Sequence, residues 1–246
     1  MSAAPDDIPR PVGAPSLDSP PVGPPPIGLG GAALTADPSG ALWWPDRALL
    51  AVADLHLEKG SAFARKGALL PPYDTAATLR RLGEVIARLK PRIVVCLGDS
   101  FHDTEGPNRL DSGDAAALAE LMAGRHWVWI AGNHDPEIPA GLGGNVSEEY
   151  RVDAITFRHE ALLMTRPGEV SGHFHPKAAV RFRGKRLSGR CFVSDARRLV
   201  LPAFGAYTGG LNVHDPAIAG LFPAGFTAWL IGPSKVYAFP GERLTG

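Results

Sequence analysis

The stretch IVVCLGD at residues 93–99 decides the fold, because it joins a short apolar strand to a glycine and a carboxylate. An apolar run of this length, bounded by turn residues, is typical of a strand buried inside a sheet. The preceding stretch DTAATLRRLGEVIARLK, residues 74–90, has helical periodicity and a candidate N-cap in Asp74. Helix and strand in this order predict parallel strands joined by helical crossovers.

The same alternation continues on both sides of this unit. The stretch ALLAVAD at residues 48–54 is another short buried strand, and a second helix is predicted from Ser112 to Gly124. The stretch WVWIAGN at residues 127–133 then supplies a third strand. These elements predict an α/β core whose strand ends carry polar residues.

The flanking regions have a different pattern. Residues 32–36 and 41–44 are apolar runs around the turn signal DPSG, which predicts a β-hairpin. After about residue 150, strand-length runs such as AITFRH (154–159) and ALLMT (161–165) are separated by Gly, Pro and Asp. We expect a second, mainly antiparallel sheet that packs on the first, with helices on the outside.

Composition limits the classes of protein that are compatible with the chain. With 246 residues, 45% of them hydrophobic, the chain is long enough for one sizeable catalytic domain. The 25 basic and 25 acidic residues cancel, so global charge favours neither nucleic acid nor membrane as a partner. Cys96 and Cys191 lie far apart in apolar stretches, which predicts two reduced core thiols. The absence of a signal pattern and of a long apolar run predicts a cytoplasmic protein with no membrane partner.

The N-terminal region, residues 1–28, is rich in proline and contains no aromatic residue. Such a segment buries too little apolar surface to offset the chain entropy lost on folding. We therefore expect a disordered Pro-rich tail at residues 1–28, followed by one domain at residues 29–246.

Polar residues with metal-binding chemistry follow the predicted strands. Ligands in open α/β sheets bind at the carboxyl ends of the strands, where segments distant in sequence meet. Each of these residues alone is weak support for a metal site. Metal-binding side chains that recur at successive strand ends are strong support for one. The candidate ligands are Asp54, His56, Asp99, Asn133, His159, His173 and His175.

This set of donors suits a pair of divalent ions. Carboxylate, amide oxygen and imidazole favour Mn, Fe or Zn, and the lack of thiolates argues against a structural zinc site. The carboxylate of Asp99 has two oxygens and could bridge both ions. Two such ions acidify a bridging water, so the expected nucleophile is a metal-bridging hydroxide that attacks phosphorus.

The ordered motifs resemble those of the calcineurin-like metallophosphoesterase superfamily, over most of the chain after residue 48. The resemblance implies a four-layer α/β/β/α sandwich. It also implies that one metal is held by Asp54, His56, Asp99 and His175, and that the second is held by Asp99, Asn133, His159 and His173. His134 would protonate the leaving oxygen or stabilise phosphate charge.

The residues after Asp99 distinguish branches of the superfamily. Protein phosphatases carry an Asp and an Arg where this chain has His102 and Asp103, so a phosphoprotein clamp is not expected. His102 resembles the SbcD-related nuclease branch, although it could also be an ordinary turn residue. Asp103 could orient His134 or His102, or could cap a turn.

A closer resemblance is to the bacterial ligase-associated DNA damage response endonuclease family, PdeM. It depends on the stretches ADLHLEKGSAFARKG, LGDSFHD, TFRHE, SGHFHP and LPAFGAYTGGLNV. It implies an endonuclease or phosphodiesterase of DNA repair that uses manganese. The implied partners are single-stranded DNA, an ATP-dependent DNA ligase and a helicase.

A local cluster of basic residues supports a nucleic-acid substrate. Eight Lys and Arg residues lie between Lys177 and Arg198 against one acid, Asp195, and such clusters bind phosphate backbones. A solvated strand face is an equally good account. Tyr207 is a candidate base-stacking residue, although it could instead close the core. The candidate substrate contacts are Arg181, Arg183, Lys185, Arg186 and Tyr207.

Three functions are compatible with these observations. The first is two-metal hydrolysis of phosphodiester bonds in DNA. The second is a phosphatase or phosphodiesterase for small-molecule or nucleotide phosphoesters, in which the basic cluster is incidental. The third is a non-catalytic scaffold on the same fold in a repair complex, although such members usually lack a ligand that this chain has.

Overall fold

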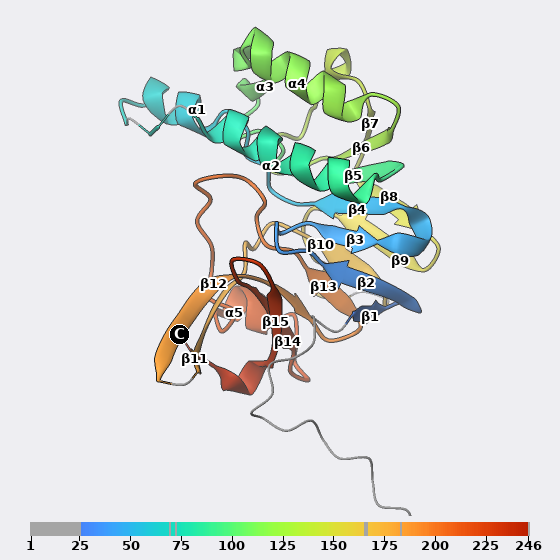
Figure 1. Ribbon diagram of the computed structural model, residues 1–246, viewed down its shortest axis with the longest axis vertical. Helices are drawn as coiled ribbons and strands as arrows, with labels where there is room; N and C mark the ends of the chain where they lie inside the picture. Colours follow the sequence, from blue (N-terminus) through green and yellow to red (C-terminus); the bar gives the residue numbers. More distant parts are fainter. Residues whose placement is uncertain (1–25, 69, 72, 165–166, 183, 246) are drawn as a thin grey trace, which may run out of the picture.

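The computed structural model describes residues 26–245, apart from residues 69, 72, 165–166 and 183. Two sheets pack face to face, with one layer of helices outside the first sheet and a short helix outside the second (Figure 1). This arrangement confirms the predicted four-layer α/β/β/α sandwich. Most of the predicted tail lies outside the described residues, but Ile27 and Gly28 already belong to a strand. The folded part therefore begins earlier than residue 29.

The first sheet has seven strands in sequence order, with an antiparallel half and a parallel half. The strands up to β4 form an antiparallel meander, and β4 to β7 are parallel. The predicted hairpin is confirmed, with Thr35 opposite Trp43 in its register. The strands are β1 (Ile27–Leu29), β2 (Ala32–Ala36), β3 (Leu42–Trp44), β4 (Leu49–Val52), β5 (Ile93–Leu97), β6 (His126–Ile130) and β7 (Asn145–Ser147).

The second sheet is mainly antiparallel, as predicted, although β10 runs parallel to both of its neighbours. Its order is β15-β14-β12-β13-β10-β9-β8, and β11 pairs with β12 and β16. The strands are β8 (Glu149–Val152), β9 (Ile155–Arg158), β10 (Glu169–Ser171), β11 (Lys177–Phe182), β12 (Lys185–Ser194), β13 (Arg198–Val200), β14 (Thr227–Ile231), β15 (Val236–Pro240) and β16 (Leu244–Thr245).

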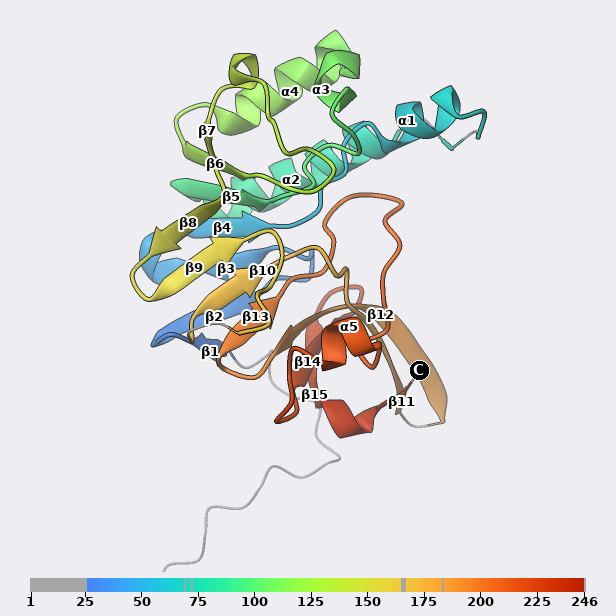
Figure 2. The same ribbon diagram turned by 180° about the vertical axis from the view of Figure 1, so that it is seen from behind.

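Helices cover the two sheets unequally. The longer helices lie on the first sheet, and Figure 2 shows from behind that the short α5 lies on the second. The α-helices are α1 (Lys59–Arg65), α2 (Asp74–Leu89), α3 (Gly106–Arg109), α4 (Ser112–Met122) and α5 (Pro216–Ala219). Three 3₁₀ helices are η1 (Pro45–Arg47), η2 (Ala140–Leu142) and η3 (Gly241–Arg243).

Two local predictions were wrong because tertiary contacts override local signals. Residues 161–164, predicted as part of a strand, form an irregular segment in which Leu163 is 86% and Met164 91% exposed. Asp74 begins α2, but its carboxylate accepts a hydrogen bond from the backbone of Gly60 in α1 instead of capping its own helix. Both differences concern segments close to the strand ends where the polar motifs meet.

The apolar core has three parts. One lies between the sheets, the second between the first sheet and its helices, and the third outside the second sheet beneath α5. Cys96 and Cys191 are buried free thiols in the last two of these, as predicted. Burial raises the pKa of both thiols, so they stay protonated. Within the described part of the chain, no helix has the length and apolarity needed to span a membrane.

We predict that Phe157→Ala destabilises the fold by about 3–5 kcal/mol, because its fully buried ring fills the core between the two sheets. Chemical denaturation of the two proteins measures the difference. Leu163→Ala, at an exposed position, is the control and should change the unfolding free energy by less than about 0.5 kcal/mol. Equal losses in the two variants would contradict this assignment of the core.

Candidate metal centre

The candidate ligands meet where strands of both sheets end. Asp54 follows β4 and Asp99 follows β5, while Asn133 lies beyond β6. From the second sheet, His159 directly follows β9 and His173 lies beyond β10. The two sheets face each other, so their strand ends bring residues from five segments to one place.

The side chains form two groups of donors, each with its ligand atoms within 4.8 Å of one another. The first group is Asp54, His56 and His175, and its two imidazole Nε2 atoms lie 3.4 Å apart. The second is Asp99, His159 and His173, with His159 Nε2 3.1 Å from His173 Nδ1. The grouping agrees with the partition that the family resemblance implied.

Asp99 lies between the two groups. Its Oδ1 is 3.5 Å from Nε2 of His159, in the second group, and its Oδ2 is 4.0 Å from Nε2 of His56, in the first. One carboxylate oxygen therefore faces each group. This is the geometry that a bridging ligand requires.

Asn133 completes the second group through its amide oxygen. Oδ1 lies 2.8 Å from Nε2 of His159 and 3.0 Å from Nδ1 of His173. The other ring nitrogen of His159, Nδ1, donates to the carbonyl oxygen of Leu97 at 2.9 Å. Nε2 of the neutral ring therefore carries no proton and can serve as a ligand atom. All seven predicted ligands thus converge.

Two of the candidate imidazoles have lowered pKa values. Burial, together with the neighbouring His175 and His134, lowers the pKa of His56 to about 2. Burial also lowers the pKa of His173, beside His159. A neutral imidazole can bind a metal without first losing a proton.

Backbone strain is concentrated on the ligands. Of eleven non-glycine residues with positive φ in the described chain, five are candidate ligands. Such conformations cost free energy in residues other than glycine, and they cluster at functional sites because the surrounding structure holds them there. The five ligands are Asp54 (54°), His56 (44°), Asp99 (45°), His173 (69°) and His175 (48°).

The glycines of the motifs leave room for these ligands. A Cβ on Gly98 would collide with the ring of His159, and one on Gly132 with the backbone and carboxylate of Asp99. At Gly172 a Cβ would lie 2.8 Å from Oδ2 of Asp54. The motif glycines are therefore explained by close packing against the candidate ligands.

His134 lies beside the two groups, with Nε2 3.9 Å from Oδ2 of Asp99. Its Nδ1 is 2.9 Å from the carbonyl oxygen of His102, which only accepts hydrogen bonds, so Nδ1 carries the proton. The ring of His102 stacks on that of His134, with centroids 5.4 Å apart. His102 thus contacts His134 through both its backbone and its ring.

Asp103 is engaged elsewhere. Its Oδ1 accepts from the backbone of Glu105 at 3.1 Å and pairs with Arg109 at 2.8 Å. Of the alternatives for this residue, the structure favours turn capping. The group that orients His134 is the carbonyl of His102, which no side-chain pattern in the sequence could indicate.

Two buried acids, Glu58 and Asp135, hold the ligand loops through hydrogen bonds that the sequence did not indicate. Glu58 accepts hydrogen bonds from Ser61 and Thr75, which ties the end of the first ligand loop to α2. Asp135 accepts from the backbone of Phe101, and burial raises its pKa to about 7. Both acids are buried, and their hydrogen bonds hold the ligand loops in place.

The predicted basic cluster does not form one surface. Arg198 is buried, donates to the carbonyl of Leu162 and lies 3.8 Å from Glu169. Arg190 donates to the carbonyl of Ala203, and burial lowers its pKa. Arg181 and Lys185 are exposed on the β11–β12 hairpin, while Arg183 lies outside the described residues.

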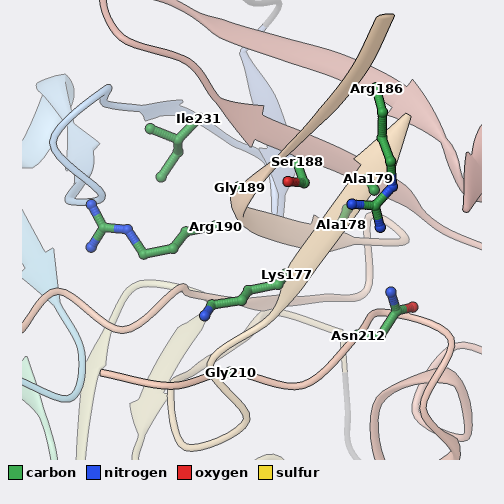
Figure 3. Close-up of a pocket in the computed structure, with 10 residues that line it drawn as sticks. All are labelled: Lys177, Ala178, Ala179, Arg186, Ser188, Gly189, Arg190, Gly210, Asn212 and Ile231. Atoms are coloured by element: carbon green, nitrogen blue, oxygen red, sulfur yellow. The ribbon is translucent and has the colours of Figure 1, made fainter. Parts of the chain in front are cut away.

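A groove remains beside the metal centre. It has a volume of about 660 Å³ and is lined by Lys177, Arg186 and Arg190. Figure 3 shows Lys177 and Arg190 extending to the same side, with Arg186 further along the hairpin. Gly210, also in its lining, packs against the carbonyl of the candidate ligand His175.

Tyr207 lies on the loop that joins the groove to the first ligand motif. It is 50% exposed and has a φ of +56°, which is unusual for a bulky residue. The loop is anchored by Gly205, whose N–H donates to the carbonyl of Asp54, and by Ala206, whose N–H donates to Thr78. Tyr207 is therefore held outward near the metal centre and does not close the core.

Comparisons with known proteins agree with this site. A model of the calcineurin-like phosphoesterase family matches residues 48–190. The 3′,5′-cyclic adenosine monophosphate phosphodiesterase CpdA of Pseudomonas aeruginosa is 33% identical over 130 residues, which are 51% of this chain and 44% of that protein. The match therefore spans less than half of that relative. The crystal structure of the Pseudomonas putida nuclease MPE is 28% identical, with a TM-score of 0.66 over 87% of this chain and 98% of that one.

We predict that Gly132→Ala weakens Mn²⁺ binding about 10- to 100-fold without removing a ligand, because the added Cβ displaces Asp99. Isothermal titration with Mn²⁺ measures the affinity. Gly28→Ala is the control, since a Cβ there meets no atom within 4 Å. Wild-type affinity in Gly132→Ala would show that Asp99 is not held as described.

Proposed function

The chain belongs to the calcineurin-like phosphoesterase family, and on that premise we propose that it hydrolyses phosphodiester bonds in DNA with two divalent metal ions. The observation that carries the proposal is the position of Asp99 between two groups of metal-binding side chains. Hydrolysis of a phosphoester follows from the family. DNA as the substrate, manganese as the metal and a role in repair are the proposed parts.

The residues divide into those that hold metal and those that handle protons. Asp54, His56 and His175 would hold one ion and Asn133, His159 and His173 the other, with Asp99 shared. When bound, such ions activate water and neutralise charge on the phosphoryl oxygens. Manganese suits this mixture of oxygen and imidazole donors, as iron and zinc also do.

His134 is placed to handle the proton of the leaving group. Because its Nδ1–H is held by the carbonyl of His102, its Nε2 faces the metal centre and Asp99. A protonated ring in this orientation could donate from Nε2 to an oxygen leaving from phosphorus. The stacked ring of His102 restrains the tilt of the donor.

The basic groove supports a nucleic-acid substrate. It contacts the carbonyl of His175 through Gly210, so a phosphate backbone at the metal centre could continue along Lys177 and Arg186. The structural relative at 28% identity is a nuclease, which agrees with this choice. A DNA ligase and a helicase remain proposed partners.

A small cyclic or linear nucleotide is the second candidate substrate, and the relative named as a cyclic AMP phosphodiesterase favours it. In that case the groove would have no part in turnover. A non-catalytic scaffold is the third candidate. The convergence of all seven candidate ligands with His134 disfavours it, and hydrolysis of any phosphodiester across a metal series would exclude it.

We predict that Asp99→Asn removes Mn²⁺-dependent hydrolysis of single-stranded DNA, and that His134→Ala lowers kcat about 10²- to 10⁴-fold. Asp99→Asn weakens both metal positions, whereas His134→Ala leaves the ligands in place. Gel assays of cleavage and circular dichroism measure activity and folding. Wild-type rates in either folded variant would contradict the proposed site.

A second prediction separates DNA from small nucleotides. The variant Lys177→Gln/Arg186→Gln should cleave single-stranded DNA more slowly, and its logarithmic salt dependence should fall by about 0.7 for each phosphate that the variant no longer neutralises. Hydrolysis of cyclic AMP measures the effect on small substrates. The charge-matched control is Arg47→Gln/Arg151→Gln, at exposed residues that pair with Asp153 and Glu149. Equal DNA cleavage by both variants would favour a small-molecule substrate.

A further inference from the structure

Helix α1 begins directly after the first ligand loop and places an aromatic ring beside His102. The ring of Phe63 lies 5.5 Å from that of His102, tilted by 41°. His102 in turn lies 5.4 Å from His134 and 5.6 Å from His56. Phe63 is therefore one ring removed from both the proton donor and a metal ligand.

Packing of the core does not account for this phenylalanine. None of the three hydrophobic clusters formed by the described residues includes Phe63. Its side chain is intermediate in exposure, whereas Phe101, at the end of the neighbouring ligand strand, is completely buried. Phe63 packs against the polar ring of His102 and is partly open to solvent. Such a position suits a ligand contact better than a core contact.

The surroundings of Phe63 are cationic. Nζ of Lys59 lies 5.8 Å from the centroid of its ring. Lys59 and Lys66 also lie close enough to His102 to lower its pKa, although burial is the larger cause. Asp103 acts on the pKa of His102 in the opposite direction, but its carboxylate also pairs with Arg109. A phosphate that approaches the ring of Phe63 meets the ammonium group of Lys59.

Helix α1 lies at one end of the helical layer (Figure 1), and its Phe63 is partly exposed. Figures 1 and 2 both show α1 projecting past the end of α2, above the loop that joins β13 to α5. That loop carries Tyr207 and leads to the groove of Lys177. The metal centre therefore has α1 on the His134 side and the basic groove on the His175 side.

We infer that α1 supplies a stacking platform for an unpaired nucleobase next to the scissile phosphate, with Phe63 as the ring and Lys59 as the cation that holds the adjoining phosphate. The inference rests on the proposed function and specifies its substrate. A ring in this position can stack only on a base that is free of its duplex neighbours. The enzyme would then select single-stranded DNA, and it would do so on the His134 side of the cleaved bond.

Stacking of one base on an aromatic side chain contributes about 1–3 kcal/mol, which corresponds to about 5- to 150-fold in affinity. The test combines Phe63→Ala with single-stranded oligonucleotides that lack one base on either side of the cleaved bond. In the wild-type protein, loss of the base on the His134 side should lower kcat/KM by that factor. In Phe63→Ala, loss of the same base should not lower kcat/KM further. In Phe63→Trp, loss of this base should again lower kcat/KM as it does in the wild type.

Tyr150→Ala is the matched control, because Tyr150 is also tilted by 41° on a histidine ring, His126, which lies at the opposite end of the parallel strands. It should respond to the missing base as the wild type does. If the base matters equally in wild-type and Phe63→Ala proteins, the stacking assignment is wrong. If Phe63→Ala acts equally on all substrates, Phe63 positions His102 and binds no base, which also overturns the inference.

Binding without catalysis distinguishes this failure from failure of the proposed function. With metal removed by EDTA, a single-stranded oligonucleotide that carries 2-aminopurine should lose fluorescence on binding to the wild type but not to Phe63→Ala. Quenching without any Mn²⁺-dependent cleavage would disprove the nuclease and leave the platform in place. Cleavage with equal quenching in both proteins would retain the nuclease and disprove the platform.

Discussion

The structure depends on two carboxylates that accept backbone hydrogen bonds from other ligand loops. Asp54 accepts from the N–H of His173, 119 residues away, and Asp99 accepts from the N–H of His134. The first bond holds the ends of the two sheets against each other, and the second holds two neighbouring loops of the first sheet together. The positive φ values of the ligands and the missing Cβ atoms at Gly98 and Gly132 follow from the same constraint, since side chains from five segments must share one small volume.

The parallel core and the ligand set were predictable because their signals are local. A short apolar run that ends in Gly-Asp or Gly-Asn indicates where a strand ends and that a candidate metal ligand follows it. Side chains whose roles depend on distant partners were not predictable. Arg198 looks like a surface cation in the sequence, but Glu169 and the carbonyl of Leu162 allow it to be buried. Asp74 looks like a cap for its own helix in the sequence, but its carboxylate accepts a hydrogen bond from the N–H of Gly60 in α1.

The same distinction explains the basic cluster. The number of basic residues in a segment does not show which of them face a groove and which pack under a loop, because both kinds occur on adjacent strands. The β11–β12 hairpin places Arg181 opposite Arg186 in its register, while Arg190 reaches across to the carbonyl of Ala203. The cations that line the groove are therefore a smaller set than the sequence suggested, namely Lys177, Arg186 and Arg190.

The orientation of His134 by a main-chain carbonyl has a consequence for evolution. A carboxylate that orients a histidine is lost with its side chain, whereas the carbonyl at position 102 is present whatever residue stands there. Substitutions at this position can therefore change the ring that lies between His134 and Phe63 of α1 while the carbonyl still holds His134. Position 102 offers a route by which selection could alter substrate preference while the hydrolytic chemistry is inherited unchanged.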